Sequence, residues 1–231
     1  MRVANSASRG CTGAIEDHAD MAWHLEQHPG MKAVVNLTPV LLDQLEDYVD
    51  QFARGTLRDP LLRLLARPEN GPLGKAERDL VLEHCLGEDD ENKARAFPAW
   101  ERLREVFALI EPRGADSALS DQHYLDVLTW YHLGWTGKTA RRASPAVRRL
   151  LDTGTGFSHG DRGDLFAVIR DLVRGILPRH ATLAAAGRIE LSTSPHHHPM
   201  APLLMSFALR AKLIRPSRCR GRPNIREATI G

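Results

Sequence analysis

Two short strand-like segments, separated by a long stretch with no strand pattern, constrain the fold of this chain most strongly. The first, residues 32–37, is a β-branched run typical of a buried strand. The second, residues 188–193, alternates polar and apolar side chains, which is typical of a strand with one buried face. From Pro60 to about Leu177 the chain contains no convincing strand, and no internal repeat is visible. The sequence therefore predicts an α/β fold that is mostly helical, with a large helical insertion between its strands.

Helical periodicity and capping residues predict the other elements. Thr38 is placed to cap a helix that begins at Pro39, and Gly55 is a typical end for that helix. Pro178 separates two predicted helices, 161–176 and 178–186, because proline lacks the backbone N–H that a helix interior needs. Further helices are expected at 14–28, 61–65, 75–86, 98–110, 120–133, 145–153 and 200–209.

Composition excludes several classes of protein. With 231 residues, 42% apolar residues and a net charge of +2, the chain is typical of a globular protein that is not attracted as a whole to nucleic acid. No apolar run approaches the roughly 20 residues of a membrane span, and the N-terminus lacks the apolar core of a signal peptide. We therefore expect a cytoplasmic protein with no membrane partner. The cysteines Cys11, Cys85 and Cys219 are far apart, which favours neither disulfides nor a zinc site, and we expect no cofactor.

A few side chains are candidates for a functional site. Glu190 faces away from the apolar side of its strand; this is ordinary exposure on an open sheet, but on a barrel strand the carboxylate would point to the interior or the mouth. Asn36, at the end of the first strand, has the same two interpretations. Trp130 and Trp135 are expected in the core, although an exposed tryptophan would suit stacking on a sugar ring. Residues 196–198 are three histidines on a loop after a strand, where α/β folds place ligands; we expect no metal there, because consecutive side chains do not converge easily on one ion.

Three stretches of the chain resemble glycoside hydrolase family 57, in the order in which that family has them. The most specific is 187–204, which is similar to the family signature G-x-I-E-x-S-x-S/T-P-x-x-H-P-I-x-P-L-L and includes Glu190 and His198. Residues 20–45 look like the second strand of the family with its flanks, and 122–137 look like its D-L-Q-V-x-x-x-L-A-W segment. The resemblance covers about residues 14–210.

The resemblance implies a fold, a reaction and a set of binding residues. Family 57 enzymes act on α-glucans with retention of configuration, and their catalytic domain is an incomplete (β/α)7-type barrel with helical additions. By this resemblance Glu190, His198 and Asn36 have supporting or binding roles toward an α-glucan or maltooligosaccharide. Trp135 is a further candidate for substrate binding, by stacking on a sugar ring. The nucleophile Glu and the acid/base Asp of the family lie on later strands, so the resemblance implies no catalytic residue in this chain, which is expected to be inactive alone. The family's opening His-Gln-Pro strand has no counterpart here.

The last residues of the chain carry a concentration of positive charge. Residues 210–226 contain seven Lys and Arg side chains, whereas Glu227 is the one acid after Arg210. Back-translation of residues 214–231 in a shifted frame can encode Leu-Pro, four residues and Tyr-Pro-Gly-Gly-x-x-Arg, which is similar to the continuation of family 57. We therefore expect an irregular segment at 1–13, a partial catalytic domain at 14–213 and an out-of-frame basic tail at 214–231. The alternative is a helical interaction module whose basic tail binds nucleic acid.

Overall fold

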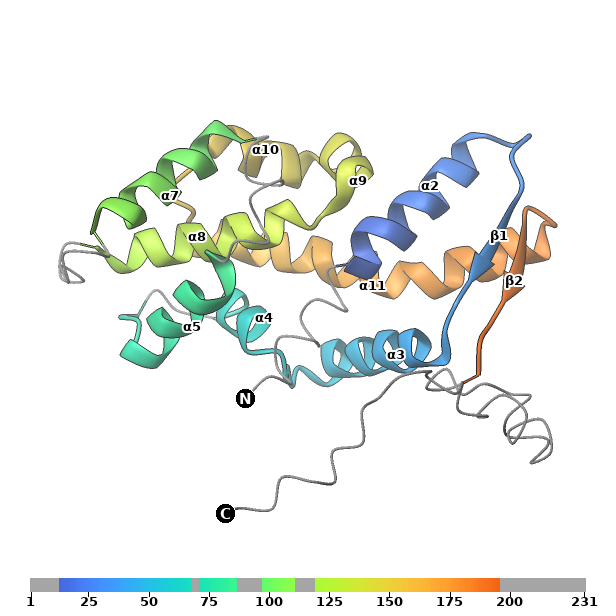
Figure 1. Ribbon diagram of the computed structural model, residues 1–231, viewed down its shortest axis with the longest axis horizontal. Helices are drawn as coiled ribbons and strands as arrows, with labels where there is room; N and C mark the ends of the chain where they lie inside the picture. Colours follow the sequence, from blue (N-terminus) through green and yellow to red (C-terminus); the bar gives the residue numbers. More distant parts are fainter. Residues whose placement is uncertain (1–12, 68–70, 87–96, 111–118, 196–231) are drawn as a thin grey trace, which may run out of the picture.

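The computed structural model describes residues 13–67, 71–86, 97–110 and 119–195. Within these ranges, a two-stranded parallel sheet lies at one end of the molecule and packs on helices, with α7, α8 and α10 at the other end (Figure 1). The elements are η1 (Ile15–Ala19, a π-helical turn), α2 (Asp20–Gln27), β1 (Ala33–Asn36), α3 (Pro39–Arg54), α4 (Pro60–Leu65), α5 (Lys75–Cys85), α7 (Pro98–Ile110), α8 (Asp121–Gly134), α9 (Gly137–Ala143), α10 (Pro145–Thr153), α11 (His159–Ala185) and β2 (Ile189–Ser192).

The two strands predicted from the sequence pair with each other in parallel. Ala33 lies opposite Ile189 and Asn36 lies opposite Ser192. Leu37 extends the ladder, since its N–H donates to the carbonyl of Ser192 at 3.0 Å. The expectation of a mostly helical α/β chain with few strands is confirmed. The described residues form two strands, and two strands do not close a barrel.

Local sequence explains how α3 begins and ends. The Thr38 side chain accepts a hydrogen bond from the N–H of Leu41 at 3.3 Å, and Pro39 occupies the first helical turn. Gly55 ends the helix in the left-handed conformation, with a φ of 66°. These roles were predicted for all three positions, and the structure confirms them.

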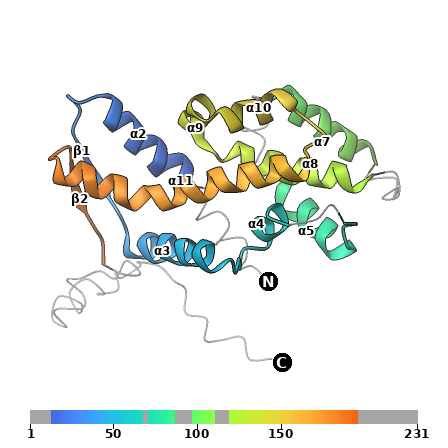
Figure 2. The same cartoon turned by 180° about the vertical axis from the view of Figure 1, so that it is seen from behind.

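Helix α11 is one continuous helix of 27 residues, so the predicted break at Pro178 is wrong. Figure 2 shows α11 running along the molecule from the sheet to the helices of the other end. Proline removes one hydrogen bond from the helix interior, but Ile176 and His180 are buried on either side of Pro178. We attribute the continuity to this tertiary packing, which offsets the local cost of the proline.

Two apolar clusters lie along α11. The larger one joins η1, α3 to α5, α7, α8 and α10 to the N-terminal and middle parts of α11. The smaller one lies under the sheet and consists of Ala22, Leu25, Val35, Leu37, Leu183 and Ile189. Arg188, just before β2, donates hydrogen bonds from its guanidinium to the carbonyls of Leu25, His28 and Met31. These bonds tie the start of β2 to α2 and to the loop that follows it. Packing on both clusters therefore makes α11 the element that joins the sheet to the helices.

A polar contact joins α2 to α9. The Asp20 carboxylate accepts hydrogen bonds from the N–H of Lys138 at 2.8 Å and from the backbone and hydroxyl of Thr139. Gly137 allows this close approach: its φ is +78°, and a Cβ built there would lie 2.6 Å from an Asp20 carboxylate oxygen. Both the backbone conformation and the space therefore require glycine.

We predict that Gly137→Ala lowers the free energy of unfolding by about 2–3 kcal/mol, because the new methyl group meets Asp20 and the φ is strained for alanine. Urea denaturation followed by circular dichroism measures the change. The matched control is Gly163→Ala on α11, where nothing lies within 4 Å of the added Cβ. This control should gain up to about 1 kcal/mol from helix propensity. Equal stability of the two variants would contradict the assigned role of Gly137.

Candidate functional site

Asn36 and Glu190 lie on the same face of the sheet. The register pairs Val34 with Glu190 and Asn36 with Ser192, and side chains of a strand alternate between its two faces. Val35 and Ile189 are buried toward the helices, whereas Asn36 and Glu190 are exposed on the opposite face. The spacing of paired strands and the rise of two residues place their Cα atoms about 8 Å apart. The structure therefore brings together two of the four residues that were expected to bind substrate.

This face carries side chains that can form hydrogen bonds to a ligand. Among the described residues, the Glu190 carboxylate takes part in no hydrogen bond or ion pair. An ionised carboxylate accepts hydrogen bonds, and the Asn36 amide both accepts and donates them. Val34, which lies opposite Glu190 and two residues before Asn36, is 67% exposed and provides an apolar surface. Such a combination suits a polyhydroxylated molecule with an apolar side, but a single carboxylate provides no acid/base pair.

Trp135 lies elsewhere in the molecule. It follows α8, is half-buried, and its ring lies 6.5 Å from that of Tyr131. It packs against the larger apolar cluster rather than the cluster under the sheet. Trp130 is buried, as predicted, and its indole N–H donates to the carbonyl of Gly154 at 2.6 Å. His198, together with the rest of 196–198, lies outside the described residues.

Two buried carboxylates that sequence reasoning missed have structural roles. Asp126 accepts hydrogen bonds from the backbone N–H groups of Gly156 and Phe157, at 2.8 and 3.0 Å, and so holds the loop between α10 and α11. Asp59 caps α4 through the N–H groups of Leu61 and Leu62 and accepts the hydroxyl of Tyr48 at 3.1 Å. Asp59 could have been recognised before Pro60 as a helix cap. Asp126 also accepts a hydrogen bond from the Gln122 side chain four residues earlier, but its role in the loop has no local pattern, because Gly156 and Phe157 lie about thirty residues later.

The pattern Gly-x-Ser-x-Gly at 156–160, absent from the candidates above, matches a hydrolase nucleophile elbow in sequence. In the structure Ser158 caps α11: its hydroxyl donates to the Asp161 carboxylate at 2.7 Å and accepts the N–H of Asp161 at 3.1 Å. An elbow places its serine between a strand and a helix, whereas this serine follows α10 and a loop. Ser158 is therefore a capping residue.

Two histidines meet where η1 packs on α11. The rings of His18 and His180 lie 5.9 Å apart in an edge-to-face arrangement. His180 is buried, and its Nδ1 donates to the carbonyl of Ile176 at 2.8 Å, which leaves Nε2 without a proton in the neutral ring. Burial lowers the pKa of His18, and the neighbouring His180 lowers it further, whereas Asp17 acts in the opposite direction. The contact is therefore favoured when His18 is neutral.

The described ranges hold no group of three His, Cys, Asp or Glu side chains arranged to bind a metal ion. In the same ranges, no helix has the length and apolar character needed to cross a membrane.

Comparison with known proteins identifies no relative. Searches against protein-family models, curated proteins and solved structures each found no match to this chain.

We predict that the free energy of unfolding decreases as the pH falls below 6.5, the pKa of histidine in an unfolded chain, and that His18 contributes to this decrease. The pKa of His18 is lowered from 6.5 in the folded state, so the unfolded chain binds a proton more readily than the folded chain. The stabilisation that neutral His18 provides is therefore present above pH 6.5 and is lost as the pH falls below that value. Burial lowers the pKa of His132 as well, so that histidine contributes in the same direction. Replacing His18 by phenylalanine keeps an aromatic ring but removes the titration. The melting temperature of His18→Phe should therefore fall less than that of the wild type.

Thermal melts at several pH values between about 7.5 and about 5.5 measure this difference. His159→Phe provides the control, because His159 is an exposed histidine on the same helix as His180. An identical pH dependence for His18→Phe and the wild type would show that His18 does not titrate against folding.

Proposed function

We propose that this chain is the N-terminal part of an α-glucan-active glycoside hydrolase or transglycosylase of the family 57 type, with a partial (β/α)7-type barrel. One observation carries the proposal: Glu190, which matches a family position near the sugar, and Asn36, which matches the family's strand-end position, share one exposed face of a parallel sheet. The long helical insertion between the two strands also agrees with the helical additions of that family.

The sheet has the form expected of part of a larger barrel. Parallel sheets are normally covered on both faces, yet here one face is packed on helices while Val34, Asn36 and Glu190 on the other are exposed. Additional strands beside β1 and β2 would turn this exposed face toward the interior of a barrel. Asn36, the last residue of β1, would then lie at the carboxyl ends of the strands, where such folds bind substrate, and Glu190 would lie two residues before the end of β2.

In this proposal the two residues bind and orient sugar but do not break the glycosidic bond. The Glu190 carboxylate accepts hydrogen bonds from sugar hydroxyl groups, and the Asn36 amide donates and accepts them. Retaining hydrolysis requires two carboxyl groups about 5 Å apart, one as nucleophile and one as acid/base. The resemblance assigns both to later strands, so the 231 residues alone should not hydrolyse an α-glucan. His198 stays a proposed binding residue, whereas Trp135, in the helical cluster, would act only on a distant part of a long chain.

We predict weak, saturable binding of maltoheptaose by the purified chain and no release of reducing sugar from amylose. Glu190→Gln should weaken the binding at least about fivefold, because it removes a charge-assisted hydrogen bond acceptor. Titration calorimetry or ligand-observed NMR measures the affinity. The control is Glu105→Gln, an exposed glutamate on α7 at the other end of the molecule.

An equal loss of affinity for maltoheptaose in Glu190→Gln and Glu105→Gln, or binding that never saturates, would show that this face carries no sugar site. Amylose turnover that disappears in Glu190→Gln would instead show that the chain is an active enzyme and that Glu190 is catalytic.

The proposal also predicts the nucleotide sequence behind the basic tail. Near residue 211 the gene should contain a change of frame, after which the codons spell Leu-Pro and then Tyr-Pro-Gly-Gly. Resequencing of the gene with several hundred bases on each side tests this. Codons that cannot spell Tyr-Pro-Gly-Gly in a shifted frame would refute the frame change, and residues 214–231 would then be a true basic tail.

A further inference from the structure

A groove between α3 and α11 joins two cavities. One has a volume of about 320 Å³ and lies at the carboxyl ends of the strands. The other has a volume of about 590 Å³ and lies farther along α3. Leu177 of α11 lines both of them, so they adjoin. The two halves of the groove differ in chemistry.

The half at the strand ends is apolar. Leu37, Leu42 and Leu177 line it, together with Leu191, which is 47% exposed. His180 also lines this half, and its Nε2 is buried without a hydrogen-bond partner among the described residues. The exposed Leu191 beside three further leucines forms an apolar surface of the kind that another segment covers.

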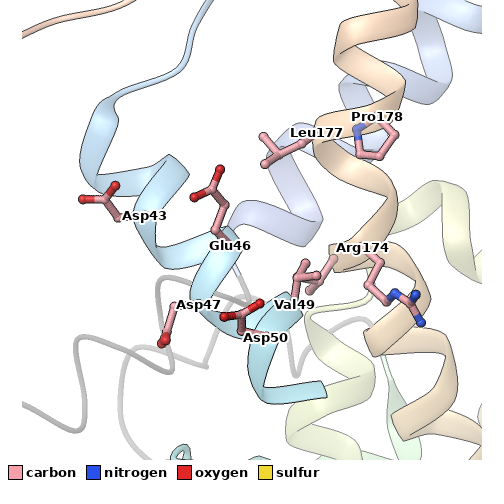
Figure 3. Close-up of a pocket in the computed structure, with 9 residues that line it drawn as sticks. Asp43, Glu46, Asp47, Val49, Asp50, Arg174, Leu177 and Pro178 are labelled. Atoms are coloured by element: carbon pink, nitrogen blue, oxygen red, sulfur yellow. The ribbon is translucent and has the colours of Figure 1, made fainter. Parts of the chain in front are cut away.

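The other half has an acidic wall. Asp43, Glu46, Asp47 and Asp50 of α3 line it together with Arg174, Leu177 and Pro178 of α11. Figure 3 shows Glu46 and Asp50 on the side of α3 nearer to α11, whereas the side chains of Asp43 and Asp47 point away from α11. Asp47 pairs with Arg58, and Asp50 with Arg54. Asp43, Glu46 and Asp50 are nevertheless exposed. The groove therefore changes from apolar to acidic with increasing distance from the strand ends.

The chain that follows β2 has the same order of properties. The described part ends at Pro195, just beyond Thr193, which lines the apolar half and donates a hydrogen bond to the carbonyl of Leu37 at 2.9 Å. Four apolar side chains then follow at helical spacing: Met200, Leu203, Leu204 and Phe207. The basic residues Arg210, Lys212, Arg215, Arg218 and Arg220 come next.

We propose that residues 200–220 of this chain dock in the groove between α3 and α11. The apolar side chains of 200–209 cover Leu37, Leu42, Leu177 and Leu191. The basic side chains of 210–220 lie along α3 and pair with its carboxylates. The occupant is thus a segment of the same chain, selected by apolar contact at one end of the groove and by charge complementarity at the other.

Chain length and connectivity favour this occupant over another molecule. The step from Pro195 to Met200 spans at most about 17 Å, which restricts the apolar segment to the neighbourhood of the strand ends. This tether keeps the segment at a high effective concentration beside the groove. The apolar part of the proposal does not depend on the proposed function, since 200–209 precede the proposed change of frame, whereas the basic part concerns 210–220 as the printed sequence reads.

Amide hydrogen exchange of the full chain tests the apolar half. Leu204→Asp places a charge on the predicted contact face and should speed exchange in α3 and in the C-terminal part of α11 about tenfold. Leu209→Asp is the matched control, since the same substitution falls on the opposite face of the predicted helix and should change these rates less than about twofold.

Disulfide formation with the native Cys219 tests the acidic half. In a Cys11→Ser background, Glu46→Cys places a thiol in the groove, and Gln44→Cys places one on the same helix but outside the groove. Docking should make the bond from residue 46 to Cys219 form at least about tenfold faster than the bond from residue 44, because the tether is nearly the same for both. Mass spectrometry of the linked peptides identifies each bond.

Three results would overturn the proposal. They are equal exchange in Leu204→Asp and Leu209→Asp, equal disulfide rates at residues 44 and 46, and linked peptides that derive mainly from two copies of the chain. The third result would assign the groove to a second molecule rather than to the same chain.

Discussion

The packing of α11 against two apolar clusters is the interaction on which the rest of the structure depends. One end of this helix buries Leu183 beneath the sheet, and the rest buries Leu165, Ile169 and Val173 among the other helices. A pair of short parallel strands has too little apolar area to be stable alone. The strands are therefore held by the helix that leads into β2, and they are supported further by Arg188, which ties the start of β2 to the end of α2.

Three carboxylates of the helical part hold loops and helix starts in place. Asp20, Asp59 and Asp126 each accept hydrogen bonds from backbone N–H groups of loops or helix starts. A carboxylate that accepts several hydrogen bonds in this way is held in one position, which suits a structural role. The exposed face of the sheet differs, because Glu190 and Asn36 there remain accessible to a ligand. This contrast is why the proposed sugar site lies on the strands and not in the helical insertion.

The two proposals concern opposite faces of the same sheet. The face that carries Glu190 looks away from the helices and would line the interior of a larger barrel. The face that carries Leu191 looks toward α3 and α11 and borders the groove that the following segment would cover. In α/β folds the chain after a parallel strand returns as a helix packed on one face, while ligands approach the carboxyl ends of the strands. Covering one face with the chain that follows β2 is therefore compatible with substrate on the other.

Local sequence determined most of the secondary structure, because its causes lie within a few residues of each other. The cap at Thr38, the alternation in β2 and the helical stripes all depend on near neighbours. The same alternation placed Glu190 on the exposed face. Only the tertiary structure decided that α11 continues through Pro178, that Asp20 receives the N–H of Lys138, and that Trp135 lies with the helical cluster. Each of these depends on contacts between residues far apart in the chain, and no local pattern contains that information.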